Sequence, residues 1–150
     1  MESRLVPYIA FDSAKEALEY YEEVFGAKII TRLSPSEEQA GQFGFDPSKV
    51  DLNSLTMHSE LEILGSRLYA ADKFTTGEKI TNGITLNLEV NSDDSESLEE
   101  SNKFFAKLEK SNEVKITMPY KEQFWGGKMG AFEDKYGVSW MLHAQSFNNK

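Results

Sequence analysis

Apolar and polar residues alternate along several short segments of the chain, and this alternation predicts strands that bury one face. The clearest case runs from 84 to 91, where every second residue is apolar. One face would carry Ile84, Leu86, Leu88 and Val90, and the other Thr85, Asn87 and Glu89. Further strands are expected at 5–11, 27–33, 55–64, 67–72, 114–121, 128–133 and 138–145.

Two longer stretches place apolar residues at the spacing of a helix. The first follows Asp12 or Ser13, either of which can cap it, and Glu16 is placed to complete a capping box with Ser13. Gly26 suits the left-handed position that ends a helix. The second helix is expected at 92–111.

The order strand, helix, strand, strand, strand therefore occurs twice, as an internal duplication with unequal loops. The modules are expected at about 1–74 and about 83–147, within a single domain of 150 residues. A polar connector at 73–82 would join them. A long loop is expected at 34–53, which holds two prolines and two glycines, and a two-residue hairpin turn at Gly65-Ser66.

The composition narrows the range of partners and chemistries. A formal net charge of −9, from 16 basic and 25 acidic residues, argues against binding to nucleic acid. The absence of cysteine excludes disulfides, thiolate zinc sites and a cysteine nucleophile. Apolar runs are too short for a membrane helix, and the N-terminus lacks a signal-peptide pattern. We therefore expect a cytoplasmic protein that binds neither nucleic acid nor membranes.

Four segments together resemble a known superfamily. They read PYIAF from Pro7, MHSEL from Met57, WGGKMG from Trp125 and DKYGVSWMLH from Asp134. In this order they resemble the PhnB-like branch of the vicinal oxygen chelate superfamily, which includes glyoxalase I, extradiol dioxygenases and bleomycin-resistance proteins. The resemblance implies an α+β fold, in which two tandem βαβββ modules form a cupped mixed sheet with helices packed outside.

The branch is often labelled 3-demethylubiquinone methyltransferase-like, but the sequence gives this activity little support. The common S-adenosylmethionine fold needs a glycine-rich turn between a parallel strand and a helix. Here Gly126, Gly127 and Gly130 follow aromatic and strand-like residues instead.

The resemblance also implies where a metal would bind. Metal-dependent members hold one divalent ion with four His or Glu ligands, on the first and fourth strands of each module. Counting along the motifs places Val6, Tyr69, Thr85 and Met141 at these positions. This set lacks the imidazole and carboxylate groups of such a site, so no metal is expected.

The two histidines keep a metal site open as an alternative. His58 lies on the polar face of its strand, and His143 shares a face with the fourth-strand ligand position. Together with Glu60, Glu133 or Asp72 they could bind a metal. They lack the local spacing typical of metal sites, however, so we expect them to be isolated histidines.

The sheet faces turned away from the helices offer aromatic walls, small residues and a few polar groups, as small-molecule sites usually do. The expected ligand-binding residues are Tyr8, His58, Tyr69, Thr85, Asn87, Trp125, Met141 and His143. Trp125 could cap the ligand or only anchor its loop. No catalytic residue can be assigned from the sequence.

We therefore expect a homodimer that binds a small organic molecule in the cup between the modules, without the usual metal. One alternative is a metal-dependent lyase, isomerase or dioxygenase with a rearranged site that uses His58 or His143. Another is a structural or interaction protein whose cup is filled by its own side chains.

Overall fold

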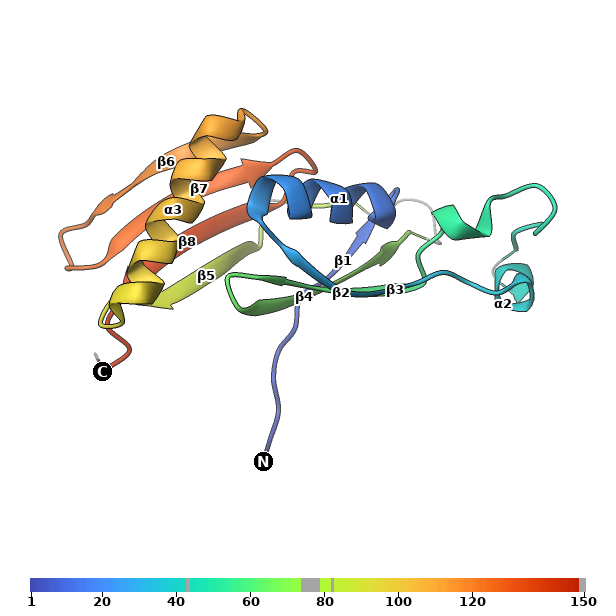
Figure 1. The fold of residues 1–150 in the computed structure, drawn as a ribbon, viewed down its shortest axis with the longest axis horizontal. Coiled ribbons are helices and arrows are strands. Elements are labelled where there is room, and N and C mark those ends of the chain that lie inside the picture. The colour runs from blue at the N-terminus through green and yellow to red at the C-terminus, as the bar shows by residue number, and fades with distance from the viewer. Residues whose placement is uncertain (43, 74–78, 82, 149–150) are drawn as a thin grey trace. The chain divides into compact units, whose positions relative to one another are not determined.

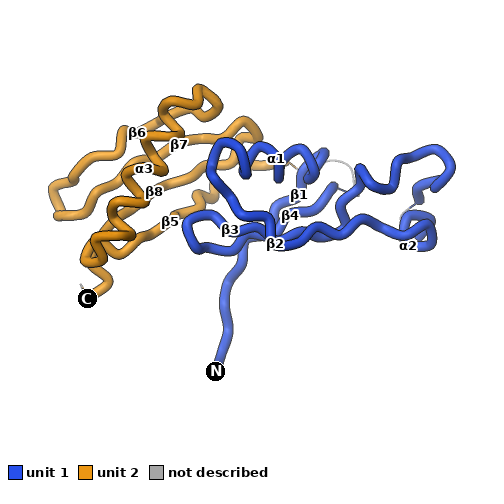
Figure 2. Tube along the Cα trace, in the orientation of Figure 1, with its two compact units in different colours: residues 1–78 blue, residues 79–150 orange. Residues whose placement is uncertain are grey.

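The computed structural model describes the chain except for residues 43, 74–78, 82 and 149–150. It divides into two compact units, Met1–Glu78 and Lys79–Lys150 (Figure 2). The first contains β1 (Tyr8–Phe11), α1 (Ala14–Phe25), β2 (Lys28–Leu33), α2 (Glu37–Gln42), the 3-10 turn η1 (Leu52–Ser54), β3 (His58–Ile63) and β4 (Ser66–Asp72). The second contains β5 (Thr85–Asn91), α3 (Ser95–Ser111), β6 (Val114–Glu122), β7 (Lys128–Asp134) and β8 (Ser139–Gln145) (Figure 1). None of the helices in the described ranges is long and apolar enough to cross a membrane.

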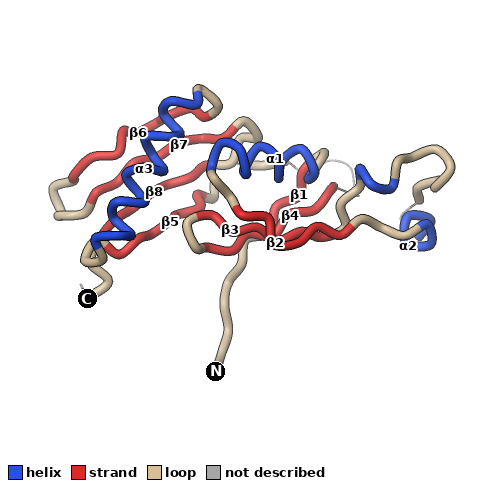
Figure 3. Tube along the Cα trace, in the orientation of Figure 1, coloured by secondary structure: helices blue, strands red, loops and turns tan. Residues whose placement is uncertain are grey.

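Each unit forms one four-stranded mixed sheet (Figure 3). The strand order is β1-β4-β3-β2 in the first unit and β5-β8-β7-β6 in the second. In both, the first strand pairs in parallel with the fourth, and the other pairs are antiparallel. The predicted α+β fold of two tandem βαβββ modules is confirmed. The connector predicted at 73–82 lies largely outside the described residues.

Strand β1 lies at an edge of its sheet, which is where a proline beside a strand is tolerated. It begins only after Pro7, so it is shorter than the strand predicted at 5–11. The Pro7 carbonyl still accepts a hydrogen bond from the N–H of Tyr69 at 2.9 Å. Leu5, which the prediction placed in the strand, is fully exposed.

Helix α1 begins and ends where the sequence predicts. Ser13 is the N-cap residue, and its hydroxyl accepts a hydrogen bond from the N–H of Glu16 at 3.3 Å. Gly26 ends the helix with φ +68°, in the left-handed region that favours glycine. The buried side of the helix consists of Ala14, Ala17, Leu18, Tyr20, Tyr21, Val24 and Phe25.

A buried aspartate ends a strand in each unit; Asp72 ties the end of β4 to two distant segments, and Asp134 holds the β7–β8 turn. In the first unit, the carboxylate of Asp72 accepts hydrogen bonds from the N–H of Ala14 at 2.8 Å and of Thr56 at 2.9 Å. In the second, Asp134 accepts from the indole N–H of Trp140 at 2.9 Å and from the N–H of Val138 at 3.1 Å. Both carboxylates therefore stabilise the unit in which they lie.

The loop predicted at 34–53 is partly helical, so that prediction is wrong for α2. The hydroxyl of Ser36 accepts from the N–H of Gln39 at 3.2 Å, and the Gln39 side chain accepts from the N–H of Ser36 at 2.9 Å. These two bonds form a capping box, which starts a helix despite the nearby prolines and glycines.

The hairpin turn between β3 and β4 lies one residue earlier than predicted. Leu64 and Gly65 form it with φ +48° and +77°, and Ile63 pairs with Ser66. A two-residue type I′ turn requires positive φ at both positions. Leucine rarely adopts that conformation, so the sequence does not indicate Leu64 as the first residue of the turn.

Helix α3 packs closely on β7 at Gly130. A Cβ atom there would lie 2.7 Å from the ring of Phe105 and 2.9 Å from the Cα atom of Tyr120. The rings of Phe105 and Tyr120 stack with their centroids 5.3 Å apart. The hydroxyls of Tyr120 and Ser101 share a hydrogen bond of 2.8 Å, which joins β6 to α3.

We expect the stability of the protein to fall at alkaline pH through Tyr120. Burial raises the pKa of its phenol above the usual value, the Ser101 hydrogen bond opposes this rise, and the Glu122 carboxylate adds to it. Above about pH 10 the unfolded chain then loses this proton before the folded chain does, so the free energy of unfolding decreases. Urea unfolding between about pH 9 and 11 should show a steeper decrease for the wild type than for Tyr120→Phe. Equal slopes would refute the assignment.

Candidate functional site

The face of the second sheet opposite α3 carries four of the residues predicted to bind a ligand, Thr85, Asn87, Met141 and His143. Leu88, Trp140 and Leu142 are buried on the α3 side, so their neighbours of opposite parity project from the other face. We call this the open face. From β5 it carries Thr85, Asn87 and Glu89, and from β8 Met141, His143 and Gln145. The parallel register places Asn87 beside Met141 and Glu89 beside His143.

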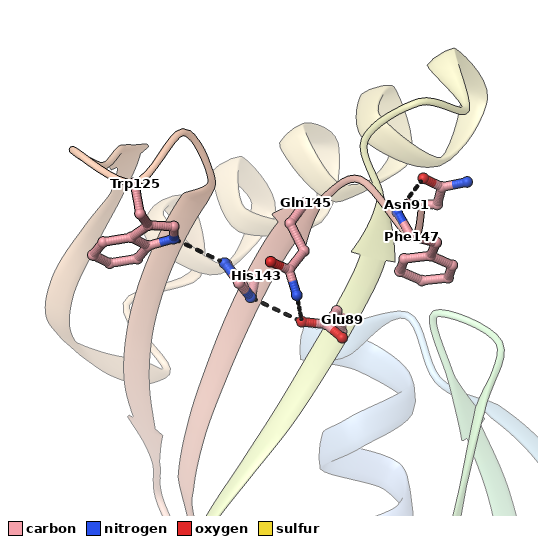
Figure 4. Close-up of polar contacts among 6 residues, drawn as sticks. All are labelled: Glu89, Asn91, Trp125, His143, Gln145 and Phe147. Carbon is pink, nitrogen blue, oxygen red and sulfur yellow. Dashed lines mark hydrogen bonds and ion pairs between the residues drawn. The ribbon is translucent and has the colours of Figure 1, made fainter. Parts of the chain in front are cut away.

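A chain of three side chains crosses the open face: Glu89, His143 and Trp125 (Figure 4). The Nδ1 atom of His143 lies 2.9 Å from the Glu89 carboxylate, and its Nε2 atom lies 3.3 Å from the indole nitrogen of Trp125. We refer to these residues as the triad. They come from β5, β8 and the β6–β7 loop.

The hydrogen bonds of the triad assign the tautomer of His143. An indole N–H can only donate, so the Nε2 atom that receives it must carry a lone pair. The imidazole proton therefore lies on Nδ1, which donates to Glu89. This is a neutral imidazole held in one tautomer and one orientation, as a carboxylate does for a functional histidine. The side chain of His143 is 13% exposed, and that of Glu89 is 38% exposed.

The surroundings of the triad support this geometry. The side-chain amide of Gln145 donates to the same Glu89 oxygen at 2.7 Å. A Cβ atom at Gly127 would lie 2.8 Å from both the Nε2 atom of His143 and the indole nitrogen of Trp125. Glycine at 127 therefore leaves the space in which the hydrogen bond between Trp125 and His143 forms.

A hollow of about 360 Å³ adjoins the triad and is lined by Glu89, Gln145, Ser146 and Phe147. Phe147 is exposed, and its N–H donates to the side chain of Asn91 at 3.2 Å. The hollow thus combines a carboxylate, an amide and a hydroxyl with an aromatic ring. Figure 4 shows three of its lining residues, Glu89, Gln145 and Phe147.

Three other predicted site residues lie together in the first unit. The imidazole of His58 packs between Tyr8 and Tyr69, with ring centroids 6.3 Å and 5.1 Å away. Its Nε2 atom lies 3.7 Å from the carboxylate of Glu60, which also binds Arg67 at 3.0 Å. This cluster has aromatic walls and one ionic pair.

The positions of the usual metal ligands do not fit a divalent cation. They hold Val6, Tyr69, Thr85 and Met141, none of which provides an imidazole or a carboxylate. Across the described residues, no group of three or more histidine, aspartate and glutamate side chains is placed to hold a metal ion.

The alternative metal sites considered from the sequence, around His58 and His143, also lack a suitable set of donor groups. In the triad, His143 has one carboxylate beside its ring, that of Glu89. Asp72 is buried and binds backbone N–H groups, and Glu133 pairs in register with Ser139 rather than with His143. His58 has one carboxylate, that of Glu60, near its ring.

The sequence does not single out Glu89, Gln145 and Phe147 as site residues. Their parity on β5 and β8 places the first two on the open face, but many acidic and amide residues share that property. The partnership of Glu89 and His143 depends on the register between two strands that are far apart in the chain. Only the known register of a relative could have supplied that signal.

Comparison with known proteins identifies the family. The family model described as 3-demethylubiquinone-9 3-methyltransferase matches residues 3–143. The chain is similar to protein YjdN of Escherichia coli (strain K12), with 30% identity over 144 residues that cover 93% of each chain.

Solved structures with the same fold include the following two. A putative 3-demethylubiquinone-9 3-methyltransferase, the PhnB protein from Bacillus cereus, has a TM-score of 0.63 at 22% identity, over 95% of this chain and 99% of that chain. The fosfomycin resistance protein FosX from Listeria monocytogenes, complexed with Mn(II) and sulfate, has a TM-score of 0.57 at 13% identity, over 98% and 93%. The chain therefore belongs to the 3-demethylubiquinone-9 3-methyltransferase family, and it has the vicinal oxygen chelate fold of its PhnB-like members.

Proposed function

We propose that this protein binds a small organic molecule on the open face of its second sheet, without a divalent metal. The observation that carries the proposal is the triad with the adjoining hollow. Together they supply an aromatic wall, an oriented neutral imidazole and a carboxylate within one surface. A few fixed polar groups among apolar ones are the usual make-up of small-molecule sites. The cluster around His58 is a second surface of similar chemistry.

The family's description does not lead us to propose a methyltransferase. In the common S-adenosylmethionine fold, a glycine-rich turn joins a parallel strand to the following helix. Here β1 and β5 lead to their helices through Asp12-Ser13 and Ser92-Asp93-Asp94, which contain no glycine. The glycines Gly126 and Gly127 lie instead in the antiparallel β6–β7 hairpin. The residues present do not fit that cofactor.

A metal-dependent enzyme is the alternative, and FosX shows that a related fold can hold Mn(II). The donor set here does not fit such an ion, so we derive no metal-dependent step. A homodimer and a cytoplasmic location remain predictions from the sequence.

Metal content and thermal melting of the purified, untagged protein test the proposal. We expect less than one tightly held metal per chain and no change of Tm with EDTA or with added Mn, Zn, Ni or Fe(II). In a library of amphipathic small molecules, we expect ligands that raise Tm. A ligand at 100 times its Kd stabilises the folded state by about 2.7 kcal/mol, which is roughly 5–10 °C for a chain of this size.

Two matched variants locate the site, since the chain has two histidines. His143→Phe should reduce the ligand-induced rise in Tm, and His58→Phe should leave it intact. One metal per chain, removed by EDTA with a lower Tm, would contradict the proposal and favour the metal-dependent enzyme.

A further inference from the structure

The Nε2 atom of His143 accepts its hydrogen bond from the indole of Trp125. The Glu89 carboxylate holds the Nδ1–H group of His143, and this bond directs the Nε2 lone pair toward the β6–β7 loop. The Nε2 atom is thus an acceptor of fixed direction, and its present partner is an indole N–H at 3.3 Å, a long hydrogen bond.

The two tryptophans of the chain differ in burial, and therefore in how easily another group could replace the hydrogen bond of their indole N–H. Trp140 is 3% exposed, and its N–H binds the buried carboxylate of Asp134 at 2.9 Å. Trp125 is 44% exposed and lies in a short hairpin loop, in which Gly126 turns with φ +94°. Its ring can leave His143 without uncovering a packed core, whereas the ring of Trp140 cannot.

The geometry points to His143 as the residue that orients the ligand. We propose that its Nε2 atom accepts a hydrogen bond from the N–H or O–H group of a neutral aromatic ligand, and that the Trp125 indole holds this place in the free protein. The inference rests on the proposed function and names its ligand class. Exchange of one aromatic donor for another leaves the number of hydrogen bonds unchanged, so displacement is inexpensive.

Charge selects among the possible ligands. Glu89 lies behind the imidazole, and Asp93 binds the hydroxyl of Ser146 at the rim of the hollow. Among the described residues, none that lines the hollow is cationic. A carboxylate ligand at the Nε2 atom would have no hydrogen to donate and would face the like charge of Glu89, so phenols and indoles should bind better than benzoate.

Titration with matched probes, followed by NMR of ¹⁵N-labelled histidine, tests the inference. The probes are phenol and indole, with anisole and 1-methylindole as controls that lack the donor. In the free protein, we expect the Nδ1–H tautomer at His143. Phenol and indole should shift the Nε2 resonance of His143 and release the Trp125 indole N–H, and the two controls should do neither. His58 serves as an internal reference.

Two variants complete the test. Trp125→Phe keeps a ring but removes the competing donor, so it should raise the affinity for phenol by roughly threefold to tenfold. His143→Phe should abolish the difference between phenol and anisole, while circular dichroism and Tm confirm that it remains folded.

The inference would be overturned if phenol and anisole bound Trp125→Phe equally, or if neither phenol nor indole bound it up to their solubility. The proposed function would survive both results if another library compound raised the Tm of the wild type and raised it less in His143→Phe. A separate result, one tightly held metal ion per chain, would refute the proposed function.

Discussion

Replacement of Asp134 by alanine is expected to lower the free energy of unfolding by about 3 kcal/mol. The carboxylate accepts hydrogen bonds from Trp140, Val138 and the N–H of Tyr136. Alanine would leave the buried indole N–H of Trp140 and the buried N–H of Val138 without this acceptor. Each unsatisfied buried donor costs about 1–3 kcal/mol. Urea unfolding followed by tryptophan fluorescence measures the effect, because Trp140 itself reports the loss.

A second substitution separates hydrogen bonding from size. Asp134→Asn keeps the shape and one acceptor oxygen, so about half of the destabilisation should remain. Asp72→Ala, which removes the buried carboxylate at the end of β4, provides a comparison in the first unit. A change of less than about 1 kcal/mol for Asp134→Ala would show that water replaces the carboxylate.

Replacement of Gly130 by alanine is expected to destabilise the protein by about 2 kcal/mol. The new methyl group would meet the ring of Phe105 at 2.7 Å and the backbone of Tyr120 at 2.9 Å. Of these, the backbone cannot move without shifting β6 away from β7. Thermal melting should show a lower Tm and retained secondary structure.

Two further variants test whether the steric clash at position 130 causes the lower Tm. Gly41→Ala adds a methyl group in α2, where no atom lies within 4 Å, and should leave Tm unchanged or raise it. The double substitution Gly130→Ala with Phe105→Leu removes one of the two clashes. A Tm for the double variant that is no higher than expected from the two single changes would show that overlap with Phe105 is not the cause.

Local signals account for the parts of the fold that the sequence predicts well. The alternation at 84–91 yields β5, and the caps Ser13 and Gly26 mark the ends of α1, because these patterns agree with the tertiary structure. The start of α2 has an equally local signal, the capping box of Ser36 and Gln39, although the surrounding prolines and glycines suggest a loop.

The candidate site is harder to predict because it depends on contacts between distant segments. Trp125 and His143 follow from the motifs, but their hydrogen bond requires the β6–β7 loop to approach β8. Glu89 joins them only through the parallel register of β5 and β8. The burial of Asp72 and Asp134 likewise arises from backbone groups that the sequence does not mark.

The parallel pairing of β1 with β4 has a consequence for synthesis on the ribosome. Tyr8 pairs with Tyr69 and Phe11 with Asp72, so the first strand leaves the ribosome long before its partner. Loop closure over such a separation makes this pairing slow compared with the β3–β4 hairpin. Until β4 emerges, β1 lacks the strand with which it pairs, and α1 lacks part of the sheet on which it packs. A nascent chain stalled before Asp72 should therefore be a substrate for chaperones, and one stalled well beyond it should not.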